Sequence, residues 1–144
     1  MNSFENPPDE EIRELLLHVR TIAMIGLSPR PKRPSHRVAL QMQRFGYRII
    51  PVRPAVDSVL DEKAYATLDR VPDKIDLVDV FRAPEYVDKI VDECLTLKLP
   101  AIWLQLEVVN IPAALRARAA GMQVVMNRCI YQDYLRFFGP VPHP

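Results

Sequence analysis

The sequence predicts an α/β protein with a doubly wound, parallel five-stranded sheet. Short apolar runs alternate along the chain with segments whose apolar residues recur at helical spacing. The runs at 22–25 and 101–104 are continuously apolar, which is typical of parallel strands covered on both faces. Right-handed crossovers between such strands favour a Rossmann-like sheet with the order 3-2-1-4-5.

The first helix is expected over 9–19, where three acidic residues favour the N-terminal end and the apolar residues form one stripe. A strand follows at 22–25 and ends at Gly26. Ser35 is expected to cap a second helix, because a serine hydroxyl can accept a hydrogen bond from the first helical turn. That helix is expected to end at Gly46, since glycine readily adopts the left-handed conformation common after helices.

The later elements alternate in the same way. Tyr65 and Leu68 are expected to anchor a short third strand and a turn. Pro84 suits the first position of a helix, and Asn110 can cap another with its side-chain oxygen. The remaining expected elements are strands over 47–52, 75–81, 101–104 and 124–126, and helices over 84–97, 110–120 and 131–138.

The length of 144 residues and the apolar fraction of 49% suit one domain, expected over 1–144 with its core at about 20–136. No apolar run approaches the ~20 residues that span a bilayer, so we expect no membrane partner. The acidic N-terminal segment lacks the features of a signal peptide, and two cysteines make no disulfide framework. We therefore expect a cytoplasmic protein. Its net charge of +1 does not indicate a nucleic-acid partner.

Basic side chains follow several of the predicted strands. Ligands of a doubly wound sheet bind outside the carboxyl ends of its strands, so these residues are expected to share one edge. The residues that follow the strands are mostly basic or polar, namely Ser28, Pro29, Arg30, Lys32, Arg33 and Ser35 after the first strand, and Arg53, Arg82, Gln105, Glu107 and Asn127–Cys129 after later ones. With the positive N-terminus of the helix at Ser35, they predict a site for a phosphate-rich ligand.

The glycine pattern of the first loop reduces the number of candidate ligands. NAD-binding loops carry G-x-G-x-x-G, and an acidic residue at the end of the second strand bonds the ribose. Here the loop reads GLSPRP from Gly26, and Arg53 stands near the acidic position. A cation at that place suits a phosphorylated ribose, which leaves NADP or coenzyme A (CoA). The chain also lacks the G-K-[ST] of a Walker A loop.

A series of motifs in order then resembles a known family. The motifs are IGLSPRPKRPS, GYRIIPVRP, YATL, DLVDVFR, WLQL and AAGMQVVMNRC. Together they resemble the small single-domain CoA-binding proteins, whose fold is similar to the CoA-binding domain of the succinyl-CoA synthetase α subunit. The resemblance covers roughly residues 20–136 and implies a Rossmann-like domain that binds CoA. Four positions depart from the family pattern, namely Arg53, Asp61, Glu107 and Asn127.

The resemblance also implies a set of ligand-binding residues. Ser28 and Arg30 would contact the phosphates, Val52 and Arg53 would border the adenosine end, and Gln105 would sit nearer the pantetheine thiol. The full set that it implies is Gly26, Ser28, Pro29, Arg30, Ser35, Val52, Arg53, Phe81, Arg82 and Gln105.

The sequence offers no evident catalytic group. The three histidines are scattered, and no metal-ligand spacing occurs. Asp76 and Asp79 are three apart on one strand and therefore face opposite sides of the sheet. Cys129 is either a small buried residue or a thiol able to form a mixed disulfide with CoA, and Arg128 could lower its pKa. Cys94 is expected in the core.

We therefore expect a binding module for CoA or an acyl-CoA with no catalytic machinery of its own, rather than an enzyme. The alternative is an enzyme component, either an NADP-linked oxidoreductase or the CoA-binding subunit of an acyl-CoA ligase whose catalytic domains lie on another chain. The candidate protein partners are a partner enzyme and a second copy of the chain in a homodimer. The apolar residues Leu135, Phe137 and Phe138 could pack on their own domain or on a second copy.

Overall fold

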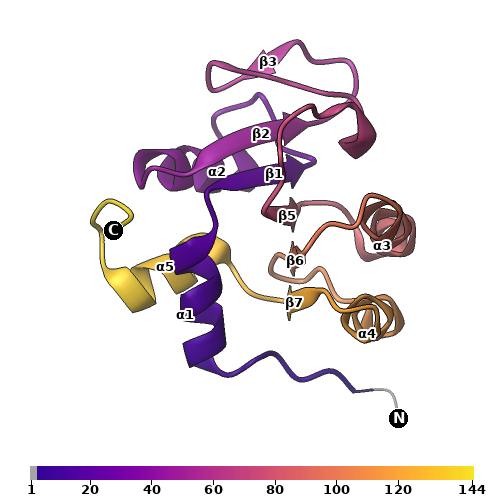
Figure 1. Cartoon of the computed structure of the whole chain (residues 1–144). Coiled ribbons are helices and arrows are strands. Elements are labelled where there is room, and N and C mark those ends of the chain that lie inside the picture. Colours follow the sequence, from indigo (N-terminus) through magenta and orange to yellow (C-terminus); the bar gives the residue numbers. More distant parts are fainter. Residues whose placement is uncertain (1–2) are drawn as a thin grey trace.

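The computed structural model describes residues 3–144, and residues 1 and 2 lie outside the described part of the chain. Its central sheet is parallel and five-stranded, which confirms the predicted fold class. The strands are β1 (Thr21–Ile25), β2 (Arg48–Val52), β5 (Leu77–Val80), β6 (Ala101–Leu104) and β7 (Gln123–Met126), in the spatial order β2-β1-β5-β6-β7 (Figure 1).

The predicted strand order is also confirmed, with its third position reduced to one residue. Tyr65 forms a single parallel bridge with Val52 at the outer side of β2. Tyr65 takes the place of the third predicted strand, and β5 and β6 are the fourth and fifth. The spatial order Tyr65, β2, β1, β5, β6 is therefore the predicted order 3-2-1-4-5. The last strand, β7, extends the sheet beyond β6.

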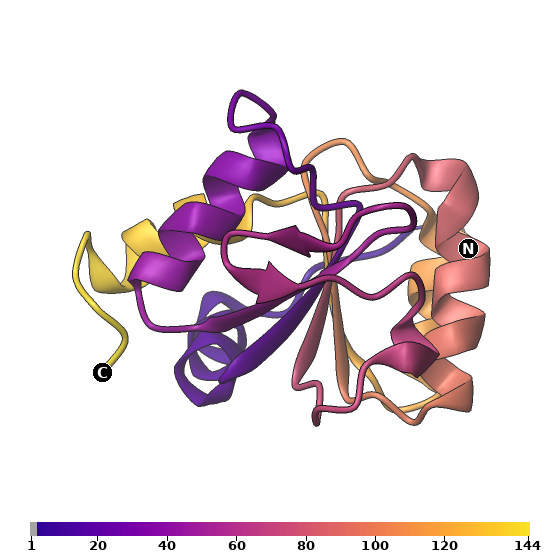
Figure 2. The same ribbon diagram turned by 90° about the horizontal axis from the view of Figure 1, so that it is seen from above.

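Two layers of helices cover the sheet (Figures 1 and 2). One face carries α1 (Asp9–His18), α2 (Pro34–Arg44) and α5 (Ile130–Phe138), and the other carries α3 (Val87–Thr96) and α4 (Ile111–Ala119). Both faces of the strands are therefore buried, as their continuous apolar runs require. None of the helices within residues 3–144 has the length and apolar character needed to cross a bilayer.

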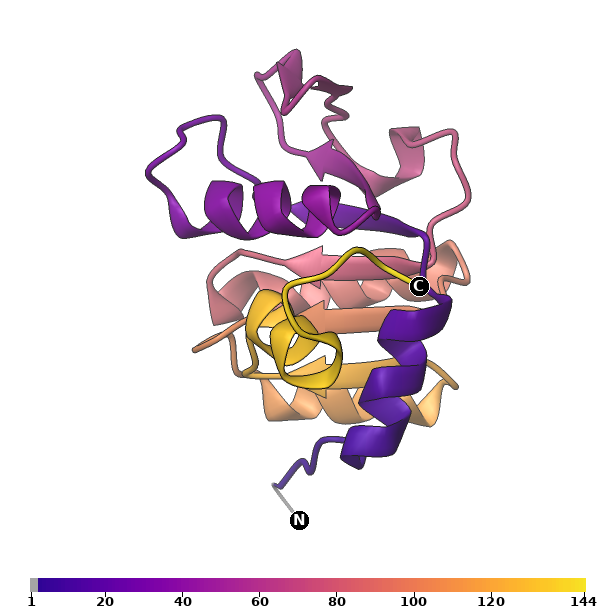
Figure 3. The same ribbon diagram turned by 90° about the vertical axis from the view of Figure 1, so that its left-hand side faces the viewer.

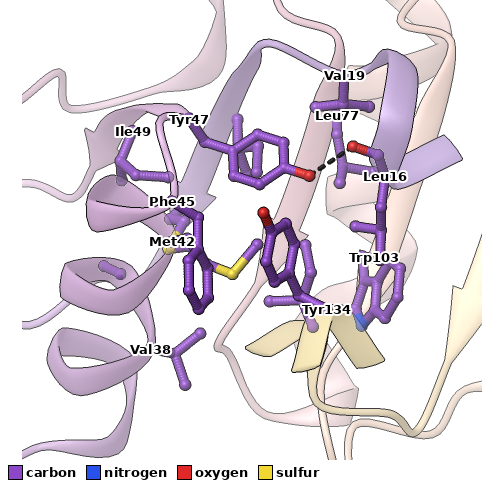
Figure 4. Packing of buried hydrophobic residues seen from close by; sticks show 14 of the residues in the cluster. Leu16, Val19, Val38, Met42, Phe45, Tyr47, Ile49, Leu77, Trp103 and Tyr134 are labelled. Atoms are coloured by element: carbon purple, nitrogen blue, oxygen red, sulfur yellow. Dashed lines mark hydrogen bonds between the residues drawn. The ribbon is translucent and has the colours of Figure 1, made fainter. Parts of the chain in front are cut away.

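Aromatic side chains join α2, β2 and α5 on the first face (Figure 4). The rings of Phe45 and Tyr134 stack with their centroids 4.0 Å apart, and the Tyr47 hydroxyl donates a hydrogen bond to the Leu16 carbonyl. The apolar residues at the end of the chain, Leu135, Phe137 and Phe138, pack against this same cluster. The tail therefore packs its apolar side chains on its own domain, where they are partly buried.

Several predicted boundaries move by a few residues, and one cap is wrong. The helix expected over 84–97 begins as a single 3₁₀ turn, Pro84–Tyr86, before α3. Asn110 caps α4 as predicted, since its Oδ1 accepts a hydrogen bond from the Ala113 N–H at 3.1 Å. Ser35 does not cap α2, because the helix already begins at Pro34 and no side chain caps it.

The segment between β2 and Tyr65 forms a small antiparallel hairpin that the sequence did not predict. Its strands, β3 (Ser58–Val59) and β4 (Glu62–Lys63), have two residues each, and a loop of Leu60 and Asp61 joins them. Both loop residues have positive φ, 54° and 63°, as in a type I′ turn. Such turns favour Asn-Gly or Asp-Gly, so Leu-Asp carried no hairpin signal.

The left-handed backbone at Asp61 makes a stability test possible. We expect Asp61→Gly to raise the free energy of unfolding by about 0.5–1 kcal/mol, because glycine has no steric cost at φ 63° and Asp61 is exposed without side-chain partners. Urea denaturation measures the change. Asp57→Gly is the matched control, since Asp57 does not have positive φ and glycine there only adds freedom to the unfolded chain. Equal effects at both positions would contradict the strain at Asp61.

Candidate functional site

Gly26 brings three strand ends together at the carboxyl edge of the sheet. Its N–H donates to the Val52 carbonyl at 3.0 Å, and its own carbonyl accepts from Arg53 Nη1 at 3.4 Å. Gly26 has φ 85°, and a Cβ at this position would lie 2.5 Å from the carbonyl oxygen of Phe81. Only glycine therefore allows β1, β2 and β5 to meet so closely.

The loop after Gly26 is held by the first turn of α2. The Ser28 N–H donates to Ser35 Oγ at 3.0 Å, and His36 Nδ1 donates to the Ser28 carbonyl at 2.9 Å. Ser28 Oγ accepts in turn from the Arg30 N–H at 3.1 Å. Both serine oxygens act as acceptors within the loop, so each hydroxyl proton is left to donate to a ligand. Ser35 thus organises the loop instead of capping the helix.

The beginning of α2 is a favourable place for an anion. The helix has eleven residues, its N-terminus faces the loop, and its first turn contains no acidic residue. The backbone N–H groups of a first helical turn have no partners inside the helix, and the helix dipole adds positive potential there. Figure 3 shows the β1–α2 loop projecting from the end of the sheet toward which the strand arrows point.

These elements enclose a cleft of ≈ 680 Å³, which we call the loop cleft. Three arginines, Arg30, Arg33 and Arg53, line it, and no acidic residue is among its described lining residues. Its lining residues are Gly26, Ser28, Pro29, Arg30, Arg33, Pro34, Ser35, Arg53, Pro54, Ala55, Val56 and Phe81. The cleft therefore combines positive charge with hydroxyl donors, which suits phosphate groups.

A second cleft of ≈ 230 Å³, the helix cleft, opens toward α3. Its walls combine apolar side chains with the charged residues Arg82, Lys89 and Glu93. The Arg82 guanidinium lies 4.0 Å from the centre of the Tyr86 ring. Its lining residues are Ile25, Val52, Pro54, Ala66, Thr67, Leu68, Arg82, Tyr86, Lys89, Ile90 and Glu93. Pro54 lines both clefts, so the two are neighbours at the end of β2.

A larger groove of ≈ 840 Å³ lies at the opposite, amino edge of the sheet. Glu10, Glu11, Glu14 and Asp76 are among its lining residues, and none of the predicted site residues is. Carboxylates would repel a phosphate ligand, so the smaller clefts at the carboxyl edge are the better candidate site despite their size.

The predicted site residues divide into three groups. Val52 and Arg82 line the helix cleft, and Gln105 lines neither cleft. The remaining residues share the loop cleft, namely Gly26, Ser28, Pro29, Arg30, Ser35, Arg53 and Phe81. Sequence reasoning missed Ala55, Val56 and Tyr86 as lining residues, because no local pattern marks a chain segment that returns to a cleft through the tertiary fold.

Gln105 is turned into the protein. Its Nε2 donates to Asp79 Oδ1 at 2.6 Å, and only 4% of its surface is exposed. Asp79 is wholly buried, and its Oδ2 is the one buried side-chain oxygen or nitrogen in residues 3–144 that has no hydrogen-bond partner. Burial raises the pKa of Asp79 to about 7. The end of β5 therefore carries a carboxyl group with an unused hydrogen-bonding atom.

Cys129 stands directly before α5 and is half-buried. The expectation that Arg128 lowers its pKa is wrong, because the Arg128 guanidinium pairs with both carboxylate oxygens of Asp133, each at 2.7 Å. Burial is the largest influence and raises the pKa of the Cys129 thiol, and the negative charges of Asp79 and Asp133 raise it further. Cys94 is fully buried, as expected.

Comparisons with known proteins agree with this arrangement. A family model described as "CoA binding domain" matches residues 20–134. An uncharacterized protein of Bacillus subtilis, YneT, is 40% identical over 126 residues, which are 88% of this chain and 93% of that protein. A solved structure of a hypothetical protein from Pyrococcus horikoshii has a TM-score of 0.89 and 32% identity, covering 96% of this chain and 100% of that chain.

The chain is also similar, at lower identity, to part of a much larger enzyme. An ADP-forming acetate–CoA ligase of Archaeoglobus fulgidus is 26% identical over 81 residues, which are 55% of this chain and only 12% of the ligase. The chain therefore spans a small part of that relative.

Proposed function

The chain belongs to the CoA binding domain family, and from this premise we propose that it binds CoA non-covalently at the carboxyl edge of the sheet. The observation that supports this most is the loop cleft itself, in which three arginines, two free hydroxyl protons and a helix N-terminus converge. CoA carries a pyrophosphate and a ribose phosphate, and the latter alone has a charge of about −1.5 to −2.

The two clefts suggest how the ligand divides between them. The loop cleft suits the phosphates, and the helix cleft offers apolar walls and the Arg82–Tyr86 pair for the adenine ring. Pro54 lies between them, which suits the short ribose link from a base to its phosphates. Val52, Arg53, Phe81 and Arg82 would then all border one nucleotide, as the family resemblance implies.

The proposed activity is binding rather than conversion of the ligand. The polar side chains that line the loop cleft are arginines and serines, which hold anions. His36, the imidazole nearest to it in sequence, uses its Nδ1 to hold the Ser28 carbonyl. The likeness to part of the acetate–CoA ligase supports a second candidate, in which the chain supplies CoA binding to a partner enzyme.

Calorimetric titration of the purified protein with CoA, dephospho-CoA, NADP and NAD tests the proposal. We expect CoA to bind, dephospho-CoA to bind more weakly because it lacks the ribose phosphate, and NAD not to bind measurably. Binding of NADP without CoA would overturn the proposal in favour of an oxidoreductase. Equal affinities for CoA and dephospho-CoA would show that the loop cleft does not bind the ribose phosphate.

Single arginine substitutions test which side chains hold the phosphates. We expect Arg30→Ala and Arg53→Ala each to weaken CoA binding roughly ten- to a hundredfold, because a charge-assisted hydrogen bond contributes about 1.5–3 kcal/mol. Arg44→Ala is the control, since Arg44 is exposed at the far end of α2. Unchanged affinity in both cleft variants would exclude these two residues from the site.

A further inference from the structure

The positive charge of this protein is concentrated in and around the β1–α2 loop. Residues 15–56 contain eight lysines and arginines and no aspartate or glutamate, although the net charge of the whole chain is only +1. Among these eight, Arg48 alone forms side-chain ion pairs within residues 3–144, and it lies at the amino end of β2, away from the loop. The basic side chains near the loop cleft are therefore not neutralised by carboxylates.

Two of these basic residues, Lys32 and Arg37, stand beside the loop cleft without lining it. Lys32 lies in the loop between Arg30 and Arg33, which both line the cleft. Arg37 lies one turn into α2, where its N–H donates to the Arg33 carbonyl at 3.2 Å. Both residues are exposed at the end of the molecule from which the loop projects (Figure 3). We call Lys32 and Arg37 the basic rim.

Exposed charges such as these hold a bound ligand weakly, because water and salt screen them. They still act on an anion that approaches within about one Debye length, which is about 8 Å at physiological ionic strength. Lys32 is the chain neighbour of Arg33, and Arg37 is about 6 Å from Arg33 along the helix axis, so both lie within this reach. Arg44, at the far end of α2, is roughly 16 Å from Arg33 along the same axis and lies beyond it.

We propose that the basic rim, Lys32 and Arg37, steers CoA toward the loop cleft and raises its rate of association without holding the bound ligand. This proposal rests on the proposed function, because the rim acts on the phosphates that the loop cleft is proposed to bind. A ligand with several negative charges is attracted before contact, so its encounters with the cleft become more frequent. Contacts inside the cleft, such as those of Arg30 and Arg53, instead set how long the ligand stays.

Kinetic measurements on the Lys32→Gln/Arg37→Gln double variant test the steering. Calorimetry gives the Kd of CoA, and exchange NMR spectroscopy of the isotope-labelled protein gives the dissociation rate constant, which divided by Kd gives the association rate constant. We expect the association rate constant to fall roughly fivefold at an ionic strength of about 0.01 M, where the Debye length is about 30 Å. At about 1 M, where the Debye length is about 3 Å, the two proteins should associate equally fast.

The dissociation rate constant separates steering from contact. In the double variant it should stay within about twofold of the unsubstituted protein, because a rim charge changes mainly the rate of association. The loss should also be larger for CoA than for dephospho-CoA, which lacks the ribose phosphate and its charge of about −1.5 to −2.

Two further variants serve as matched controls. Lys74→Gln/Lys98→Gln removes the same net charge from exposed residues that precede β5 and β6 at the amino edge of the sheet, and should not slow association. Lys32→Arg/Arg37→Lys keeps both charges on side chains of different shape and should associate as fast as the unsubstituted protein.

An unchanged association rate constant in Lys32→Gln/Arg37→Gln at low ionic strength would overturn the steering proposal alone, as would an equal fall in the amino-edge control. Faster dissociation with unchanged association would also overturn it, because Lys32 and Arg37 would then hold the bound ligand. If the unsubstituted protein bound no CoA in the calorimeter, the proposed function would be overturned, and the steering proposal with it.

Discussion

Gly26→Ala is expected to lower the free energy of unfolding by about 2–4 kcal/mol and to abolish measurable CoA binding. Two costs add at this position. Alanine at φ 85° is strained, and its Cβ would lie 2.5 Å from the Phe81 carbonyl oxygen, a backbone atom that cannot rotate away. The end of β5 must therefore move from β1, which displaces Phe81 and Arg82 from the two clefts. Urea denaturation and calorimetric titration measure the two effects.

Gly121→Ala is the matched control for this substitution. Gly121 also has positive φ, 100°, but no atom lies within 4 Å of the Cβ that alanine would add. The control should lose only the conformational part of the stability, about 1–2 kcal/mol, and should keep its affinity for CoA. If both variants lost the same stability and bound CoA with the same affinity, the close approach of Gly26 to Phe81 would not be needed for stability or for CoA binding.

Asp79→Asn is expected to stabilise the protein at pH 8 and to flatten its dependence on pH. Burial raises the pKa of Asp79 from 3.8 to about 7, so the folded state holds this proton more tightly than the unfolded chain does. The stability that the proton confers is complete below about pH 4 and is lost as the pH rises to about 7, by an amount on the order of 4 kcal/mol. Asparagine does not ionise and removes this loss.

Denaturation of the two proteins from pH 4 to pH 8 measures the difference. Asp76→Asn is the control on the same segment, because Asp76 Oδ2 accepts hydrogen bonds from the backbone N–H groups of Arg20 and Thr21, each at 3.0 Å. That variant should still lose stability between pH 4 and pH 7. A parallel loss in Asp79→Asn would show that Asp79 is ionised in the folded protein at low cost.

The sequence predicted the fold because its signals are local and repeated. Continuous apolar runs such as 22–25 and 101–104 are too short for buried helices and are typical of strands buried on both faces, and the helices between them favour a parallel sheet. Asn110 was predicted as a cap for the same reason, since a cap acts within four residues. The hairpin at Leu60 and Asp61 was missed, because its turn has an unfavourable sequence that packing holds in place.

The roles of Ser35 and Gln105 could not be predicted from local sequence patterns. Both were predicted by position, but each one's hydrogen-bond partner lies elsewhere in the chain, Ser28 for Ser35 and Asp79 for Gln105. A side chain's partner depends on which strand ends become neighbours, and the sequence does not state distances.

The amino-acid sequence by itself determined the class of sheet, its strand order, the basic character of its carboxyl edge and the family to which the chain belongs. Only the tertiary structure divided the predicted residues between the basic loop cleft and the helix cleft, and only it left one carboxylate oxygen of Asp79 buried without a hydrogen-bond partner. The physical reason is that periodicity and charge are properties of short segments. Burial and close approach arise when strands distant in sequence meet, and they decide how each residue acts.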